Sequence, residues 1–258
     1  MPVAIKKEVK APMKPMTSAF LLRVEKYCDL SPDQRQVLER FESDVEKRKK
    51  RTPVFDPTRP DARLAIVRSG WAVSRLTSGS SNTTISHIYM PGDVIGVGSL
   101  GMAHLSEEVV MQTDGAVSLV DRDDVSRLGE RFPLLLGVLL ALSNLDDAML
   151  RDRLHAITRL SAEDRLIHFI LSIKARLAQS TEQPSDRFPL HLSQRDIGDA
   201  LGLTDIYVNR LMRKLLSNGQ IEISRPYVRI TDRSGWERRV GFKDRFAEID
   251  ANWMAKAS

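Results

Sequence analysis

Apolar residues recur at helical spacing in two long stretches of the chain, and the first of these covers residues 19–50. Ser31-Pro32 is typical of a helix start within it. The apolar positions are Leu21, Leu22, Val24, Leu38, Phe41 and Val45. We predict that residues 19–50 are helical. The basic run Lys47, Arg48, Lys49, Lys50 and Arg51 would then be the solvated end of this segment, and a contact with DNA is the alternative.

The second helical stretch covers residues 133–158 and begins at Pro133, a residue that suits the first turn of a helix. An apolar stripe at three-four spacing is formed by Leu135, Leu139, Leu142, Leu145 and Met149, and it is widened by Leu134, Val138 and Leu140. A stripe this wide can face its own domain and a partner helix at once. We predict a dimerisation helix with the five stripe residues at the interface. A purely internal core helix is the alternative.

Between these stretches, residues 63–121 have the pattern of short strands. The segments LAIVRSGWAVSRL, ISHIYM and AVSLVD are rich in apolar and β-branched residues. Turn sequences such as SGSSNTT and PGD separate them. Several short strands at this spacing predict a small barrel or roll.

A short break at residues 158–161 marks the predicted domain boundary. Ser161 is a good N-cap, and the helix SAEDRLIHFILSIKARLAQ that follows has a buried face at Leu166, Phe169, Ile170, Ile173 and Leu177. The polar stretch 180–187 is predicted to be a loop.

Residues 191–232 contain two short helices joined by a tight turn. Ser193 can cap the first helix, with Asp196 three residues on, as in a capping box. Gly202 stands where the chain must reverse, and Thr204 can cap the second helix. The inward positions are Ile197, Leu201, Leu203, Val208, Leu211, Met212 and Leu215. This spacing is the pattern of a helix-turn-helix, whose second helix enters the major groove of DNA.

The outward positions of this unit are the candidate DNA contacts. We predict base contacts from Asp205, Ile206, Asn209 and Arg210. Arg210 suits guanine, Asn209 suits adenine, and Ile206 suits a thymine methyl group. Backbone contacts are predicted for Ser193, Gln194, Arg195, Thr204, Arg213, Lys214, Arg225 and Arg229.

The last third of the chain completes this domain. Ile221, Ile223, Val228 and Ile230 alternate around Arg225-Pro226, which predicts a β-hairpin, the wing. Residues 234–253 are predicted to form one further amphipathic helix, which can bury Trp236, Val240, Phe242, Phe246 and Ile249.

Composition narrows the class of protein. Lys and Arg number 39 against 34 Asp and Glu, so the net charge is +5, which favours polyanionic partners. Cys28 is the single cysteine, so one chain can form no disulfide and no cysteine-ligated cluster, as expected in a reducing cytoplasm. Neither a membrane span nor a signal peptide is recognisable, and residues 1–18 are expected to be flexible.

The order of these elements resembles the Crp/Fnr family of bacterial transcriptional regulators, from about residue 20 onward. The likeness is strongest in LSQRDIGDALGLTDIYVNRLMRKL, and PGDVIG (91–96) resembles a turn of the family's β-roll. The Val-Asn-Arg of the second helix is similar to a branch common in alphaproteobacteria. The resemblance implies a homodimer on a palindromic site, with half-sites roughly 34 Å apart, and RNA polymerase as a partner of an activator. The family's main base-contacting positions fall on Asp205, Ile206 and Arg210, and Arg210 alone has the usual residue.

The sensor departs from the family's cyclic-AMP-binding pattern. Val97 stands where those members have a ribose-binding glutamate, and LGMAHLSEEVVMQT has no arginine for a phosphate. We therefore expect no control by cyclic AMP, no cofactor and an unknown effector. The oxygen-sensing branch of the family needs four cysteines, and this chain has only Cys28. Haem control stays open, although we assign the five histidines (His87, His104, His155, His168 and His191) to surface or packing roles.

We conclude that the chain has an α+β fold: an N-terminal antiparallel β-roll, a long dimerisation helix and a C-terminal winged helix-turn-helix. The expected domains are a flexible segment 1–18, a sensor 19–132, the helix 133–158 and a DNA-binding domain 159–258. The expected function is sequence-specific transcriptional regulation without catalysis. Two alternatives are a winged-helix adaptor that no longer reads DNA, and a cupin-type binder of a metal or small molecule.

Overall fold

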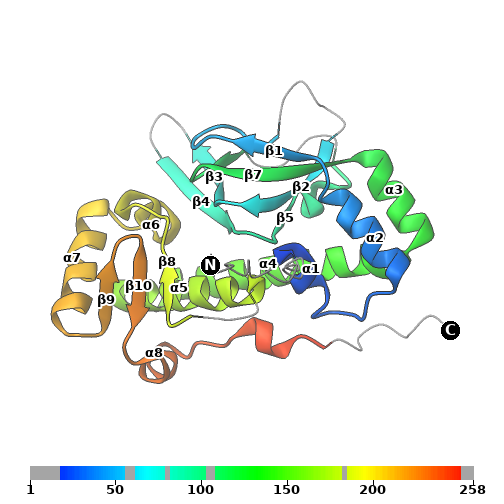
Figure 1. Cartoon of the computed structure of the whole chain (residues 1–258). Coiled ribbons are helices and arrows are strands. Elements are labelled where there is room, and N and C mark those ends of the chain that lie inside the picture. Colours follow the sequence, from blue (N-terminus) through cyan, green and yellow to red (C-terminus); the bar gives the residue numbers. More distant parts are fainter. Residues whose placement is uncertain (1–17, 56–61, 79–81, 103–107, 182–184, 251–258) are drawn as a thin grey trace, which may run out of the picture.

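The computed structural model describes residues 18–55, 62–78, 82–102, 108–181 and 185–250 (Figure 1). The predicted flexible segment lies outside these ranges, apart from Ser18. The N-terminal part contains helices α1 (Ala19–Val24), α2 (Pro32–Phe41) and α3 (Arg122–Arg131) and the 3-10 helix η1 (Val97–Ser99). Its strands are β1 (Val45–Arg48), β2 (Ala62–Ser69), β3 (Ala72–Ser78), β4 (Asn82–Tyr89), β5 (Val94–Ile95), β6 (Glu108–Met111) and β7 (Gly115–Asp121).

These strands form two antiparallel sheets that pack face to face as a roll. One sheet has the order β1-β7-β2-β5 and the other β4-β3-β6. Val67, Met111 and Val117 are among the buried residues between them. Alternating apolar positions in β7, such as Val117 and Leu119, give the sheet its inner face. The predicted α+β class and antiparallel roll are confirmed.

The predicted helix over residues 19–50 is wrong at its C-terminal end. Helix α2 ends at Phe41, and Val45–Arg48 form strand β1, which pairs with Gly115–Ser118 of β7. Lys47 and Arg48 therefore belong to a strand, and Lys49–Arg51 belong to the turn that follows it. A four-residue strand has too few positions to show its period, so its pairing partner decides its conformation.

Helix α4 (Pro133–Arg159) runs beneath the roll from the α3 end toward the C-terminal domain (Figure 1). Leu135, Leu139 and Leu142 are at most 5% exposed and pack with α1, α2 and the β2-β7 sheet. This corrects the predicted dimer interface at these three positions, because the chain's own core covers them. Leu145 and Met149 are only partly exposed. A different face of the helix points away, with Leu140 at 48% and Leu154 at 59% exposure.

The C-terminal part begins with helix α5 (Ala162–Leu177), capped by Ser161, whose hydroxyl accepts the Asp164 N–H. It continues with η2 (Ala178–Ser180), β8 (Arg187–Pro189), α6 (Gln194–Leu201), α7 (Asp205–Ser217), β9 (Ile221–Ser224), β10 (Tyr227–Ile230), α8 (Arg233–Val240) and η3 (Arg245–Glu248). The hairpin β9-β10 is the predicted wing, and β8 adds a third strand in the order β8-β10-β9. The core of this part is continuous with Trp71, Val73 and Ile85 of the roll.

The predicted single helix over residues 234–253 is wrong. Helix α8 ends at Val240 because Gly241 adopts a left-handed conformation with φ of 61°. The chain then runs back along α4 to η3, where Arg245 makes two 2.8 Å hydrogen bonds to Asp152 and Phe246 is buried. Residues 251–253 lie outside the described ranges.

Candidate DNA-binding surface

Helices α6 and α7 are fixed at their N-termini by the side chains that the sequence indicated. The Ser193 hydroxyl accepts the Asp196 N–H at 3.1 Å, and the Asp196 carboxylate accepts the Ser193 N–H at 2.9 Å, which completes a capping box. Thr204 accepts the Tyr207 N–H at 3.2 Å. Gly202 reverses the chain between the helices with φ of 66°. These contacts make the bihelical unit that carries the exposed face of α7.

A second glycine, Gly198, sets how closely the two helices approach, and the sequence pattern did not reveal it. A Cβ atom at this position would lie 2.4 Å from the carbonyl oxygen of Leu203. The Leu203 N–H also donates to the Gly198 carbonyl oxygen at 3.1 Å. The backbone of the turn therefore rests directly on α6, and a side chain at residue 198 would push the helices apart.

The outward face of α7 is open to solvent at most of the predicted base-contacting positions. Asp205 and Arg210 are exposed, and Ile206 is 80% exposed, which is unusual for an isoleucine. The Arg210 guanidinium lies 4.3 Å from the centroid of the Tyr207 ring. This cation–π contact, which the sequence pattern alone does not reveal, holds the Arg210 side chain along the helix.

Asn209 differs from the other three because it is only partly exposed. Its side-chain oxygen accepts a hydrogen bond from the Gln194 amide at 3.1 Å, so these two predicted DNA contacts bind each other across α6 and α7. The amide of Asn209 keeps its two N–H donors for another acceptor. A bidentate contact to adenine would use the oxygen as well, whose second lone pair is left by the bond to Gln194.

Some of the residues predicted to contact the DNA backbone are exposed and available to a phosphate, and others already bind a carboxylate of the protein. Arg195, Arg213, Arg225 and Thr204 are exposed. Ser193 differs, because its N–H and its hydroxyl both donate to the Asp196 carboxylate. Lys214 bonds Glu163 at 2.5 Å and Arg229 bonds Glu222 at 3.1 Å. The exposed Arg229–Glu222 pair contributes little and exchanges readily for a phosphate, whereas the Glu163 side chain that binds Lys214 is only 14% exposed.

The roll holds the first helix of this unit through Asp196. Arg75 of β3 reaches the Asp196 carboxylate at 2.7 Å, and the amide of Gln112, which follows β6, reaches it at 2.8 Å. Burial acts to raise the pKa of Asp196, but hydrogen bonds from Ser193 and Arg75 outweigh burial and lower it. The same carboxylate therefore caps α6 and attaches it to the sensor.

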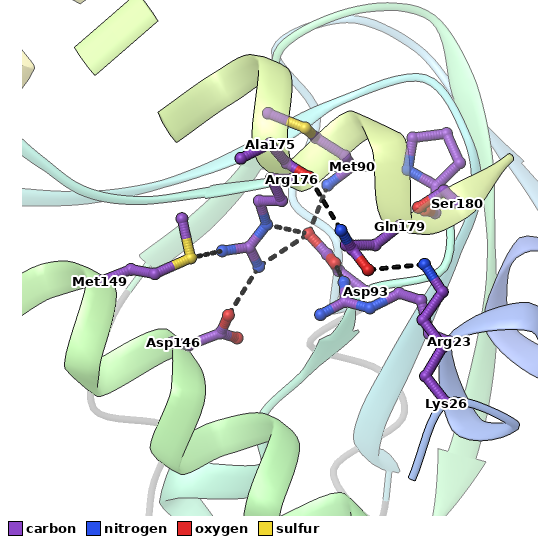
Figure 2. A network of polar contacts seen from close by, with 11 residues as sticks. Arg23, Lys26, Met90, Asp93, Asp146, Met149, Ala175, Arg176, Gln179 and Ser180 are labelled. Carbon is purple, nitrogen blue, oxygen red and sulfur yellow. Dashed lines mark hydrogen bonds and ion pairs between the residues drawn. The ribbon is translucent and has the colours of Figure 1, made fainter. Parts of the chain in front are cut away.

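A second polar junction lies where α1, the turn before β5, α4 and α5 meet (Figure 2). Asp93, 1% exposed, pairs with Arg23 of α1 and with Arg176 of α5, the latter at 2.8 Å. Arg176 also reaches Asp146 of α4 at 2.9 Å. The Met90 N–H donates to Asp93 at 2.8 Å. Two guanidinium groups and two carboxylates thus balance one another inside the protein.

The burial of this network changes the pKa of Arg23. Its burial, together with the nearby charge of Arg176, lowers the pKa of Arg23 to about 10. A buried ion pair adds little net stability when complete, but the loss of one partner leaves an unpaired charge and is costly. We infer that the network fixes one position of α5 relative to the roll, and hence the position of the C-terminal domain that follows α4.

Comparison with known proteins agrees with this architecture. A family model described as the Crp-like helix-turn-helix domain matches residues 164–239. The chain is 27% identical over 176 residues to the transcriptional regulatory protein btr of Bordetella pertussis, covering 68% of this chain and 72% of that protein. It is 24% identical over 178 residues to the fumarate and nitrate reduction regulatory protein of Escherichia coli K12, covering 69% and 71%.

The chain is therefore similar to regulators of the Crp/Fnr family, and the likeness includes a Crp-like helix-turn-helix domain. Among solved structures, FixK2 from Bradyrhizobium japonicum matches this regulator with a TM-score of 0.66 at 22% identity, over 75% of this chain and 95% of that one. The CRP-family regulator TTHB099 from Thermus thermophilus matches with a TM-score of 0.59 at 13% identity, over 80% and 99%. These matches support a DNA-binding transcriptional regulator that has a helix-turn-helix and a cyclic-nucleotide-binding-like roll.

The roll of this protein has a cavity of about 230 Å³ against α4. It is lined by Phe55, His87, Tyr89, Val94, Ile95, Gly96, Val97, Gly98, Ser99, Val109, Ser143, Asp146 and Asp147. No lysine or arginine is among these described lining residues, whereas two carboxylates are. A cavity of this charge favours a neutral or cationic molecule over a phosphate.

Proposed function

We propose that this Crp/Fnr regulator binds a palindromic DNA site as a homodimer and reads each half-site with α7. The observation that supports this most directly is the exposure of α7: Ile206 is 80% exposed, and Asp205 and Arg210 are also free of the roll. Arg210 is the principal base contact, with Asn209, Ile206 and Asp205 around it. The proposed division of the chain is a sensor over 19–132, a dimer helix over 133–158 and a DNA-binding domain from 159.

The proposed dimer forms along the exposed face of α4. This helix is the one described segment that is long and apolar enough to cross a membrane, and 22% of its most apolar window is buried inside the chain. Leu140 and Leu154 lie fourteen residues apart, two heptads, on the open face, at 48% and 59% exposure. An apolar helix face at this spacing is covered by a second helix in a coiled-coil dimer. A second copy of the chain supplies that helix.

Regulation in this proposal does not use cyclic AMP. The cavity of the roll has Asp146 and Asp147 on its wall, and the phosphate of a cyclic nucleotide would meet their charge. Asp146 also bonds Arg176, so a molecule that entered the cavity would act directly on the junction between sensor and DNA-binding domain. The proposed location is the cytoplasm, and RNA polymerase is a further partner if the protein activates transcription.

The base-reading role of α7 predicts a different result for two arginine variants. Arg210→Ala should cost roughly 1–3 kcal/mol on the cognate site and relax one base position, because it removes a bidentate base contact. Arg195→Ala should weaken binding to all sequences alike and flatten the salt dependence, because it removes a phosphate contact. Fluorescence titration on cognate and random duplexes across salt concentrations measures both effects.

Equal losses for Arg210→Ala on cognate and random DNA would contradict the base-reading role. A wild-type protein without DNA affinity at low salt would contradict the proposed function as a whole.

The dimer assignment predicts the outcome of a charge placed on the open face of α4. Leu140→Glu should convert the protein to a monomer and strongly lower its affinity for a palindromic duplex, because the carboxylate would be buried against its symmetry mate. Glu130→Gln, an exposed change on α3, is the control. Sedimentation equilibrium measures the mass, and a dimeric Leu140→Glu variant would refute this interface.

A further inference from the structure

The exposed turn Lys49–Lys50–Arg51, here called the basic turn, has no role in the function proposed above. It follows β1, and all three side chains are exposed. The Arg51 N–H donates to the Met111 carbonyl oxygen at 2.7 Å. The turn is therefore attached to the end of β6 and does not project as a free loop.

That attachment places the basic turn beside the helix-turn-helix. Gln112 follows Met111 directly, and its amide binds Asp196 of α6 at 2.8 Å. Trp71, whose carbonyl oxygen accepts the Gln112 N–H, lies edge-on to the ring of His191 at 5.3 Å. A short series of contacts thus connects Arg51 to the N-terminal end of α6.

A groove of about 520 Å³ lies between the roll and the winged domain at this point. Lys50 and Thr113 line its sensor side, while Ser193, Gln194 and Arg225 line its other side. These last three residues belong to the proposed contacts with the DNA backbone. The basic turn and the backbone-contacting edge of the winged domain therefore share one continuous surface.

The charge of this surface is positive. The carboxylate of Asp114 lies beside the turn; it accepts hydrogen bonds from the Lys49 ammonium at 3.1 Å and from the Lys50 N–H at 2.8 Å. Within the described part of the chain, the Lys50 and Arg51 side chains form no ion pair. Among the residues that the structure describes, only Asp114 is paired with the turn, and the Lys49–Asp114 pair, with side chains 83% and 64% exposed, is weak.

We propose that the basic turn binds the phosphate backbone of DNA just outside each half-site, so that the sensor domain itself extends the DNA-binding surface. This inference rests on the proposed function, because it takes the DNA position from Ser193, Gln194 and Arg225. Continuity with that surface favours duplex DNA over an acidic protein as the occupant. The contact is to phosphates and adds affinity without sequence preference.

The test compares two duplexes and two variants of the full-length protein. One duplex ends at the outer edges of the two half-sites, and the other extends about one helical turn, roughly 10 base pairs, beyond each. Lys49→Gln/Lys50→Gln removes two charges from the basic turn. Arg122→Gln/Arg131→Gln removes two exposed charges from α3, at the opposite end of the roll (Figure 1).

We expect Lys49→Gln/Lys50→Gln to weaken binding of the long duplex several-fold and to make its log–log salt slope shallower by about 0.9 for each lost contact. Binding of the short duplex should not change, and the α3 variant should behave as wild type on both. Unchanged binding of the long duplex, or an equal loss on both duplexes, would overturn the proposal. Wild-type protein that binds neither duplex would instead refute the proposed function.

Discussion

Asp93→Ala is expected to destabilise this regulator by about 3–5 kcal/mol, a large fraction of the stability of an ordinary domain. The substitution leaves the guanidinium groups of Arg23 and Arg176 facing each other, each less than a tenth exposed, without the carboxylate between them. It also removes the acceptor of the Met90 N–H. Urea unfolding followed by circular dichroism measures the loss.

Asp146→Ala is the matched control for this prediction. Asp146 is more exposed than Asp93 and binds only one of the two arginines, so its loss should cost clearly less. Replacing all four charges together, as in Arg23→Met/Asp93→Leu/Asp146→Asn/Arg176→Met, should recover much of the stability lost in Asp93→Ala, because no unpaired charge stays buried. A loss below about 1 kcal/mol for Asp93→Ala would show that the network does not hold the junction.

Gly198→Ala is expected to cost about 3 kcal/mol, at the upper end of what overpacking usually costs. The added methyl group would meet the Leu203 carbonyl oxygen at 2.4 Å, and backbone atoms cannot turn aside as a flexible side chain can. Relief requires α7 to shift relative to α6. We therefore also expect specific DNA affinity to fall more than tenfold at temperatures where the variant stays folded.

Gly202→Ala provides the comparison within the same turn. No atom lies within 4 Å of a Cβ built at residue 202, so its cost comes from the left-handed backbone alone, about 1–2 kcal/mol. Specific DNA affinity should be nearly unchanged in this variant. Thermal unfolding and titration with a cognate duplex separate the two glycines, and equal effects on DNA affinity would contradict the close-approach role of Gly198.

Features that depend on local chemistry were predictable from the sequence. The caps Ser161, Ser193 and Thr204 occur where they were expected, because each satisfies N–H groups two or three residues further on. The short strands, the wing and the reversal at Gly202 likewise follow from local patterns. The family resemblance then predicted the order in which these parts are assembled.

Features that depend on distant partners were not predictable. Asp93 and Arg176 are 83 residues apart, and the motif PGD reads as turn chemistry until the fold brings an arginine to it. The apolar stripe predicted how wide the apolar surface of α4 is. Which face of α4 is buried depends on the packing of α1 and α2 against it. Gly198 looks like an ordinary helix residue until Leu203 is placed against it.

The contact of η3 with α4 limits how the winged domain can move relative to α4. The winged domain leaves α4 through residues 160–161 and is fastened to it a second time by Arg245 on Asp152. The winged domain is therefore held to α4 at two points and not by a single hinge, in addition to the contacts of Asp196 and Arg176 with the roll. Any reorientation must release those two contacts with the roll, and must then either turn about the line that joins the two attachments to α4 or break the Arg245–Asp152 ion pair.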